Sequence, residues 1–371
     1  MDQSIAPPPP TRALQYDGRI GELYGIFLTN LLLTIVTLGI YNFWATTRNR
    51  RYMWSRMAFQ GQRFEYTGTG LELFLGFLLA GLVLIGIVLG LGGLIYILPE
   101  GLNFIPVLAF YAVFAVLAAG AVFSAQRYRL TRTLWCGIRG GMTGSALAYG
   151  AKAIGYYSLL LLSLFQLGPW VSVRLAEARI NASSFGSAPF SFRGRARKLY
   201  WPYLLTLVGM VALFLITGGL VYAAAMASMP DAVRSGSAPA DMDFYLEQMQ
   251  GVIWLAILAY AAFGILATLL SCWYSALLTR HIVGNSALGD VRFASSVSGV
   301  TLLSLTLGNL LILLLTLGLG YPIVLHRNAR YLAGTLFVYG GLDPAELAQS
   351  TLAAPRFGEG MYQQLDAGGA I

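Results

Sequence analysis

Side chains that could act as acids, bases or metal ligands are scarce in this sequence. The two histidines, His281 and His326, each stand beside an arginine and have no second ligand-type residue close by. Cys136 and Cys272 lack the CxxC spacing of a metal or redox site. No serine elbow, HExxH pattern, phosphate loop or dinucleotide fingerprint occurs. We therefore expect no catalytic set, no metal and no cofactor, and an enzyme acting on lipid is the least supported class.

A few polar residues lie within or beside apolar segments, and these are the candidates for contact with a substrate or for lining a path. They are Asn30, Thr37, Lys152, Asn309 and Thr316. The asparagines and threonines can form hydrogen bonds between helices that fix their packing, or they can give a path a polar lining. The lysine can extend toward the membrane interface, or it can bind a substrate or a lipid phosphate.

Arginines follow the same apolar segments and are candidates for contact with lipid headgroups. They are Arg48, Arg50, Arg51, Arg327 and Arg330. Each cation near an anionic membrane surface contributes about 1 kcal/mol of binding. The formal net charge is +8, and the basic residues form short clusters beside apolar segments. This distribution predicts anionic membrane lipids as partners and argues against nucleic acid.

One stretch of the chain recurs with the same spacing. Residues 30–61 and 309–340 share matched residues, including Asn30 with Asn309, Thr37 with Thr316 and Arg51 with Arg330. A weaker third copy lies around residues 167–190, with Gln166 in place of the threonine. Glycines and prolines stand where each apolar run gives way to aromatic and cationic residues, so we predict a break in the middle of each copy.

Composition predicts an all-α polytopic membrane protein. Hydrophobic residues make up 57% of the chain and charged residues only 11%, whereas a soluble domain has about 25% charged residues. Four long apolar runs are expected to span the membrane, at residues 71–98, 104–125, 201–227 and 251–278.

The charge pattern suggests how the remaining apolar segments lie. If only the four long runs cross, every basic cluster lies on the cytoplasmic side and the acidic loop 229–250 lies outside. We therefore predict four spanning helices plus three repeated re-entrant or interfacial helix pairs, with both termini cytoplasmic. The alternative is seven or more simple spans.

The expected organisation is a single membrane domain with two tails. Residues 1–19 are expected to form a disordered arm. Residues 20–341 are expected to form the membrane domain, and residues 342–371 are expected to form a cytoplasmic tail. The internal repeats are placed at about 20–66, 135–192 and 289–340.

Several sequence blocks resemble those of a known family. The blocks are Gly21-Glu22-Leu23, Thr37 to Tyr41, Phe43-Trp44, Arg50-Arg51-Tyr52, Phe64 to Gly68, and Thr316 to Pro322 with Arg330-Tyr331. Through them the chain from Tyr16 to Gly341 resembles the YjgN-like family of bacterial inner-membrane proteins of unknown function. The resemblance implies a multi-pass protein of the bacterial cytoplasmic membrane, and it brings no reaction and no catalytic residues.

Two classes of function therefore stay open. The first is a transporter, channel or lipid-handling protein, because broken helices in repeats can form a binding site in the membrane. The alternative is a non-catalytic membrane scaffold or lipid organiser, for which interfacial helices rich in aromatic residues and arginine suffice. The sequence predicts neither the substrate nor the oligomeric state.

Overall fold

The computed structural model describes residues 11–228 and 242–352, which form two compact units. Unit 1 comprises residues up to Ala196, Arg280–Ser296 and the chain from Leu307, and unit 2 comprises Arg197–Thr279 and Val297–Thr306. Parts of the expected N-terminal arm, acidic loop and C-terminal tail, namely residues 1–10, 229–241 and 353–371, lie outside the described residues.

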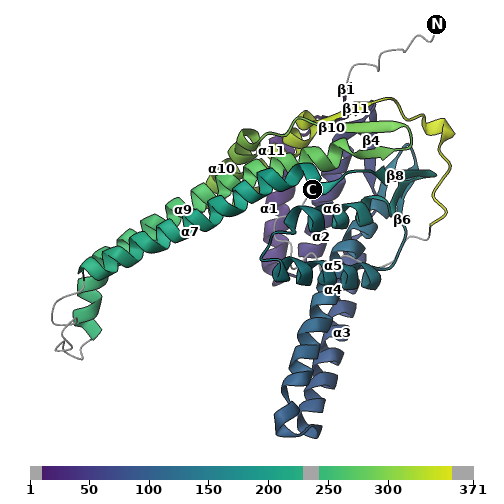
Figure 1. The fold of residues 1–371 in the computed structure, drawn as a ribbon. Coiled ribbons are helices and arrows are strands. Elements are labelled where there is room, and N and C mark those ends of the chain that lie inside the picture. The colour runs from purple at the N-terminus through teal and green to yellow at the C-terminus, as the bar shows by residue number, and fades with distance from the viewer. Residues whose placement is uncertain (1–10, 229–241, 353–371) are drawn as a thin grey trace. The chain divides into compact units, whose positions relative to one another are not determined.

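Within the described residues, four helices are long and apolar enough to cross a membrane, as the sequence predicts. They are α3 (Gly70–Ile97), α4 (Phe104–Thr131), α7 (Tyr200–Ser228) and α9 (Met242–Gly284). Helix α3 begins with a capping box, in which the Thr69 side chain accepts from the Glu72 backbone and the Glu72 carboxylate accepts from the Thr69 backbone. A short 3-10 turn, Glu100–Leu102, joins α3 to α4, so the two helices run antiparallel (Figure 1).

Three further helix pairs are shorter. Their bounds are α1 (Ile20–Val36) with α2 (Asn42–Ser55), α5 (Ala146–Leu162) with α6 (Gly168–Ile180), and α10 (Gly299–Leu315) with α11 (Tyr321–Thr335). The first helix of each pair has 17 residues, which is about 25 Å and less than the ~30 Å hydrocarbon core of a bilayer.

The described residues are mostly helical, as expected, but the expectation of an all-α protein is wrong in one respect, because eleven short strands among these residues form one sheet in unit 1. The strands are β1 (Thr11–Arg12), β2 (Leu14–Tyr16), β3 (Met57–Phe59), β4 (Gln62–Tyr66), β5 (Thr133–Trp135), β6 (Ile138–Met142), β7 (Ser183–Phe185), β8 (Ala188–Phe192), β9 (Ser286–Leu288), β10 (Val291–Ser295) and β11 (Leu336–Tyr339). All neighbours are antiparallel, in the order β1-β11-β10-β9-β8-β7-β6-β5-β4-β3-β2.

The sheet closes into a barrel through the N-terminal strand. β1 pairs with β11 and β2 pairs with β3, and only Ala13 separates β1 from β2. The Ala13 backbone N–H itself donates to the Leu336 carbonyl. Residues 11–16, which the sequence analysis assigned to a disordered arm, are therefore part of the barrel wall. Closure leaves the sheet without a free edge.

The barrel has a turn end and a helix end. Four two-residue turns join its hairpins, at Gln60-Gly61, Cys136-Gly137, Gly186-Ser187 and Gly289-Asp290. In the first two turns both residues have positive φ, as a type I′ turn requires. The helices connect to the opposite ends of the strands. Four segments that lie wholly within the described residues each run from a strand, through two α-helices, to the next strand, and the segment from β8 to β9 contains α7 and α9.

Helices of unit 1 pack closely around one long helix. A Cβ on Gly150 of α5 would overlap the carbonyl oxygen of Val116 in α4, and Ala153 of α5 is fully buried. Phe123 of α4 packs against Tyr149 of α5, with ring centroids 5.2 Å apart. The small residues on α5 therefore allow the backbones of α4 and α5 to approach closely.

Unit 2 contains α7, α9 and the first turns of α10. Tyr203 and Tyr274 join α7 to α9, with ring centroids 5.1 Å apart, and Phe214 contacts Phe263 farther along the pair. Gly299 at the start of α10 lies against the backbone of Trp273. Most other large apolar side chains of α7 and α9 are exposed, which suits helices surrounded by lipid.

Candidate functional site

The loops of the three short helix pairs are built alike. Each has five residues, 37–41, 163–167 and 316–320. The second and third residues of each loop have positive φ: Leu38 and Gly39, Leu164 and Phe165, and Leu317 and Gly318. Three loops of equal length and backbone shape therefore join helices of nearly equal length.

Every backbone N–H of these fifteen loop residues has a hydrogen-bond acceptor. In the first loop the N–H groups of residues 37 to 40 donate to carbonyls of Leu33, Ile35, Thr34 and Thr37, and the Tyr41 N–H donates to Thr37 Oγ1 at 2.9 Å. The other two loops repeat this pattern, with Ser163 Oγ and Thr316 Oγ1 as the side-chain acceptors. Thr37 and Thr316 thus each accept a backbone hydrogen bond within their own loop.

The same loops carry exposed apolar side chains. Leu38 is 94% exposed, Leu317 is 92% exposed and Leu164 is 76% exposed. None of the fifteen loop residues is charged. Loops at a water interface normally carry polar turn residues. These three loops, here named the tips of the helix pairs, are instead chemically suited to hydrocarbon.

An arginine stands at the same position in each second helix. Arg48, Arg174 and Arg327 each lie six residues after the start of their helix. At 1.5 Å per residue this is about 9 Å from the tip. Arg48 is exposed, Arg174 pairs with Glu177 at 2.8 Å, and Arg327 is half-buried against Gly308. The first arginine of each second helix therefore lies at a similar distance along the helix from its tip.

The candidate asparagines bridge the helices of their own pairs. Asn30 is 5% exposed, and its Nδ2 donates to Asn49 Oδ1 at 3.2 Å. Asn309 makes the equivalent bond to Asn328 Oδ1 at 2.7 Å. Lys152 is exposed on α5. The structure thus gives the two asparagines packing partners and does not bring the five candidate residues together.

The candidate arginines fall into different environments. Arg50 is only 3% exposed and donates to the hydroxyl of Tyr66 at 3.3 Å, so its guanidinium lies inside the protein. Arg51 is exposed and donates to the Gly68 carbonyl, and Arg330 is exposed on α11.

An ion pair joins the bases of α3 and α4. Glu72 accepts from Arg132 at 2.7 Å and from the buried hydroxyl of Tyr128 at 2.6 Å. Each partner compensates the desolvation of the other charge, so the pair fixes the base of this long hairpin. The histidines contribute no cluster, since the described residues contain no group of three or more metal-ligating side chains.

Titratable groups on the outside of the barrel have shifted pKa values for structural reasons. The hydrogen bond from Arg63 lowers the pKa of Asp17. Burial, with a smaller contribution from Tyr52, raises the pKa of Tyr16 to about 12. Burial and then the nearby Arg330 lower the pKa of His326, whose ring contacts Tyr16. These shifts follow from packing and ion pairing and indicate no acid and base pair.

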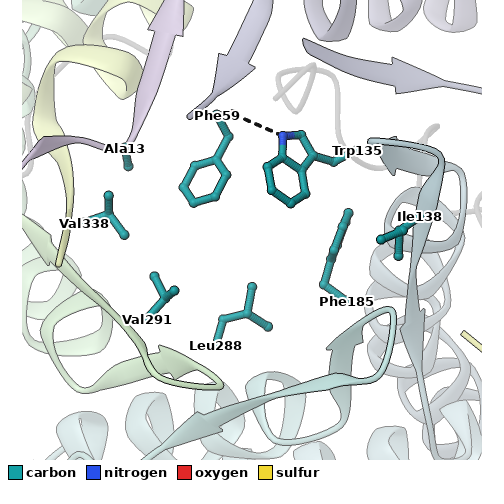
Figure 2. Packing of buried hydrophobic residues seen from close by; sticks show 8 residues of the cluster. All are labelled: Ala13, Phe59, Trp135, Ile138, Phe185, Leu288, Val291 and Val338. Atoms are coloured by element: carbon teal, nitrogen blue, oxygen red, sulfur yellow. Dashed lines mark hydrogen bonds between the residues drawn. The ribbon is translucent and has the colours of Figure 1, made fainter. Parts of the chain in front are cut away.

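The barrel contains a partly open apolar cavity of about 240 Å³. Figure 2 shows the buried side chains of the barrel core, of which Ala13, Phe59, Trp135, Phe185 and Leu288 line the cavity. The lining residues are Ala13, Leu14, Phe59, Phe64, Trp135, Phe185, Phe190, Leu288, Phe293, Leu336 and Leu342. Trp135 Nε1, the one polar side-chain atom among them, donates to the Phe59 carbonyl at 3.1 Å (Figure 2). The lining therefore offers no hydrogen-bonding side chain to an occupant.

The C-terminal segment 341–352, here named the strap, lies across the turn end of the barrel. Its Leu342 lines the cavity, and the Leu342 N–H donates to Gln60 in the first hairpin turn. The Ala348 backbone N–H donates to Ser187 Oγ in the third turn. Beside the second turn, Arg139 donates to the carbonyls of Ser350 at 3.0 Å and Leu352 at 2.6 Å. The strap thus spans three hairpins.

A comparison with protein families matches residues 11–364 to the bacterial proteins of unknown function DUF898. The chain belongs to this family. It is 26% identical over 367 residues to the inner membrane protein YjgN of Salmonella typhimurium, with 90% of each chain covered. It is 22% identical over 377 residues to the proteins of that name from two strains of Escherichia coli, with 91% of each chain covered. No solved structure matches the chain.

The names of these DUF898 relatives agree with the four apolar helices of the chain in indicating a membrane protein. Sequence reasoning missed two parts of the candidate site. Ser163, and not Gln166, supplies the hydroxyl of the second tip. The cavity was missed because its walls come from strands of two to five residues; the glycine-containing dipeptides at their turns were a usable signal.

Proposed function

We propose that this protein is a multi-pass protein of the bacterial inner membrane that handles lipid in the leaflet next to its barrel. Helices α3, α4, α7 and α9 cross the membrane, and the three short pairs are repeated re-entrant units. Each pair enters the near leaflet and returns on the side it entered. The observation that carries the proposal is the apolar tip of each short pair, in which every backbone N–H has a hydrogen-bond acceptor.

Irregular backbone is costly in a bilayer because hydrocarbon offers no hydrogen-bond partner. The tips meet this condition for their backbone donors, since each loop N–H has an acceptor and the fifth N–H of each loop donates to a Thr or Ser hydroxyl. Exposed leucines such as Leu38 and Leu317 are unfavourable in water by about 25 cal/mol per Å² of apolar surface. Insertion of the tips into hydrocarbon removes that cost.

The arginines set the depth of insertion. The ~9 Å between each tip and its first arginine is less than half of the ~30 Å hydrocarbon core, so the tips end inside one leaflet. Exposed Arg48, Arg51 and Arg330 then meet anionic headgroups. Lys152 stands eleven residues before the second tip, about 16 Å along α5, so it also reaches the headgroup level. By the positive-inside rule the barrel and both termini are cytoplasmic.

Lipid handling is favoured over transport of a polar solute. The asparagines and threonines that could line a polar path each bond within their own helix pair. Three tips in a single leaflet instead displace acyl chains on one side of the membrane, next to a row of cations. This arrangement suits a protein that binds anionic lipid and promotes its movement.

Spin labels test the position of the tips. In a background with Cys136→Ser and Cys272→Ser, cysteine replaces Leu38, Leu164 or Leu317, and a nitroxide is attached in liposomes. We expect each label to collide with oxygen and to be shielded from a water-soluble nickel reagent. A label at Gln60, in a hairpin turn, is the aqueous reference. Tip labels as accessible to nickel as the Gln60 label would contradict the re-entrant arrangement.

A lipid assay tests the activity. Proteoliposomes containing fluorescent anionic lipid should show protein-dependent lipid movement. The triple variant Arg48→Gln, Arg51→Gln and Arg330→Gln should bind anionic vesicles up to about a hundredfold more weakly, at ~1 kcal/mol per charge. Arg292→Gln, on an exposed barrel strand, is the control. Binding without lipid movement would indicate a scaffold, and solute flux without lipid movement would indicate a transporter.

A further inference from the structure

We infer that the barrel cavity is a binding site for one alkyl chain of an amphiphile, whose polar end stays at the turn end under the strap. The inference extends the lipid-handling role by naming a second lipid site. It does not depend on the helix tips, because every residue that lines the cavity belongs to the barrel or to the strap.

The lining selects for hydrocarbon. All eleven lining residues are apolar, and the Trp135 indole N–H is already bonded to the barrel wall. A polar group placed inside would lose its hydrogen bonds to water and gain none. An apolar cavity of about 150 Å³ accepts a benzene ring, so 240 Å³ accommodates a longer hydrocarbon segment.

The apolar lining continues from one hairpin to the next. Phe59, Trp135, Phe185 and Leu288 end the first strands of their hairpins. Phe64, Phe190 and Phe293 stand at the third position of the second strands and also line the cavity. Adjacent hairpins pair Phe64 with Trp135 and Phe190 with Leu288, so an alkyl chain in the cavity meets apolar side chains from several hairpins.

The access route is the turn end. The lining includes Leu342 of the strap but stops short of Tyr66, Met142 and Phe192, the buried last residues of their strands. The strap is held from outside the cavity by Arg139 and by polar side chains of other hairpin turns. Displacement of Leu342 opens the cavity toward these polar residues, so a chain that inserts there leaves its head in a polar setting.

Trp135 provides a direct test, because it lines the cavity. The full-length protein is purified in a steroid-based detergent, which has no alkyl chain to compete. Stearate that carries a nitroxide near its methyl end is titrated while tryptophan emission is recorded. The difference between wild type and Trp135→Phe isolates the contribution of Trp135. We expect saturable quenching of this contribution, and competition by unlabelled palmitate.

Variants locate the bound chain. Ala13→Phe fills the cavity and should abolish the saturable quenching of Trp135. Ala58→Phe adds the same volume on β3 outside the lining and should leave it intact. If Ala13→Phe lowers the thermal midpoint so far that folding is in doubt, Leu14→Phe together with Leu288→Phe replaces it, because these changes narrow the lining without adding a tryptophan. Native mass spectrometry of the purified protein identifies the natural occupant as a phospholipid or a free fatty acid.

Three results would overturn the inference. The first is Trp135 emission that no concentration of labelled stearate quenches in folded wild-type protein. The second is quenching that persists unchanged in folded cavity-filling variants, since the chain then lies elsewhere. The third is quenching that rises linearly without saturation, which indicates partition into the micelle. All of these quenching experiments are done in detergent. Their outcome therefore does not depend on whether the tips insert into a bilayer.

Discussion

Single hydroxyl groups explain part of the pattern in the sequence. Thr37 and Thr316 stand out as polar residues in apolar runs, and the sequence alone leaves open whether they fix packing or line a path. In the structure each accepts the last N–H of its own tip, at 2.9 Å and 2.7 Å. Ser163 does the same in the second pair at 3.2 Å. A serine can replace a threonine in this role because only the hydroxyl is used.

Loss of that hydroxyl should destabilise the protein in a membrane. Thr37→Val keeps the shape of the side chain but leaves the Tyr41 N–H without its acceptor. An unsatisfied buried donor costs about 1–3 kcal/mol. We expect a lower thermal midpoint for Thr37→Val in lipid nanodiscs, measured by intrinsic fluorescence. Thr29→Val is the control, since the Thr29 hydroxyl donates to the Gly25 carbonyl and accepts no tip N–H. Equal midpoints for both variants would contradict the role.

At the scale of elements, the sequence predicts helices well and strands poorly. The four long helices follow from apolar runs of sufficient length, and three shorter apolar helices also coincide with apolar runs of the sequence. The strands have two to five residues, too few for an alternating pattern to be recognised. The dipeptides Gln60-Gly61 and Gly289-Asp290 each contain a turn-forming glycine, yet the strands beside them pair with hairpins far away in the sequence. Pairing over such separations is set by tertiary structure.

The contact between α4 and α5 gives a prediction with a matched control on the same helix. Gly150→Ala places a methyl group against the Val116 carbonyl, whereas the site of Gly155→Ala is open. We expect Gly150→Ala to lower stability by about 1–3 kcal/mol through overpacking. Gly155→Ala should be neutral or stabilising by up to about 1 kcal/mol, because alanine favours helix. Thermal unfolding in detergent compares them, and a neutral Gly150→Ala would show that the helices are farther apart.

For the whole molecule, the two ends of the described chain complete one barrel. The N-terminal residues 11–16 pair with β11 on one side and with β3 on the other, and the strap then covers the turn end. Sequence reasoning assigned both ends to tails, because prolines precede one end and the other has mixed composition. Neither end has a long apolar run. Its contacts with the barrel therefore cannot be recognised without the positions of the other strands.

Closure of the barrel by the N-terminus can be tested by truncation. Deletion of residues 1–16 removes Ala13 from the cavity wall and exposes the edges of β3 and β11, which are prone to pair with other chains. We expect this variant to aggregate, or to unfold at a much lower temperature in detergent. Deletion of residues 2–10 removes none of the described strand pairs and should leave the thermal midpoint unchanged. If both truncations elute as monodisperse protein with the wild-type midpoint, the N-terminal strand does not hold the barrel closed. Loss of saturable Trp135 quenching in the longer truncation alone would show instead that this strand forms the cavity wall without deciding the fold.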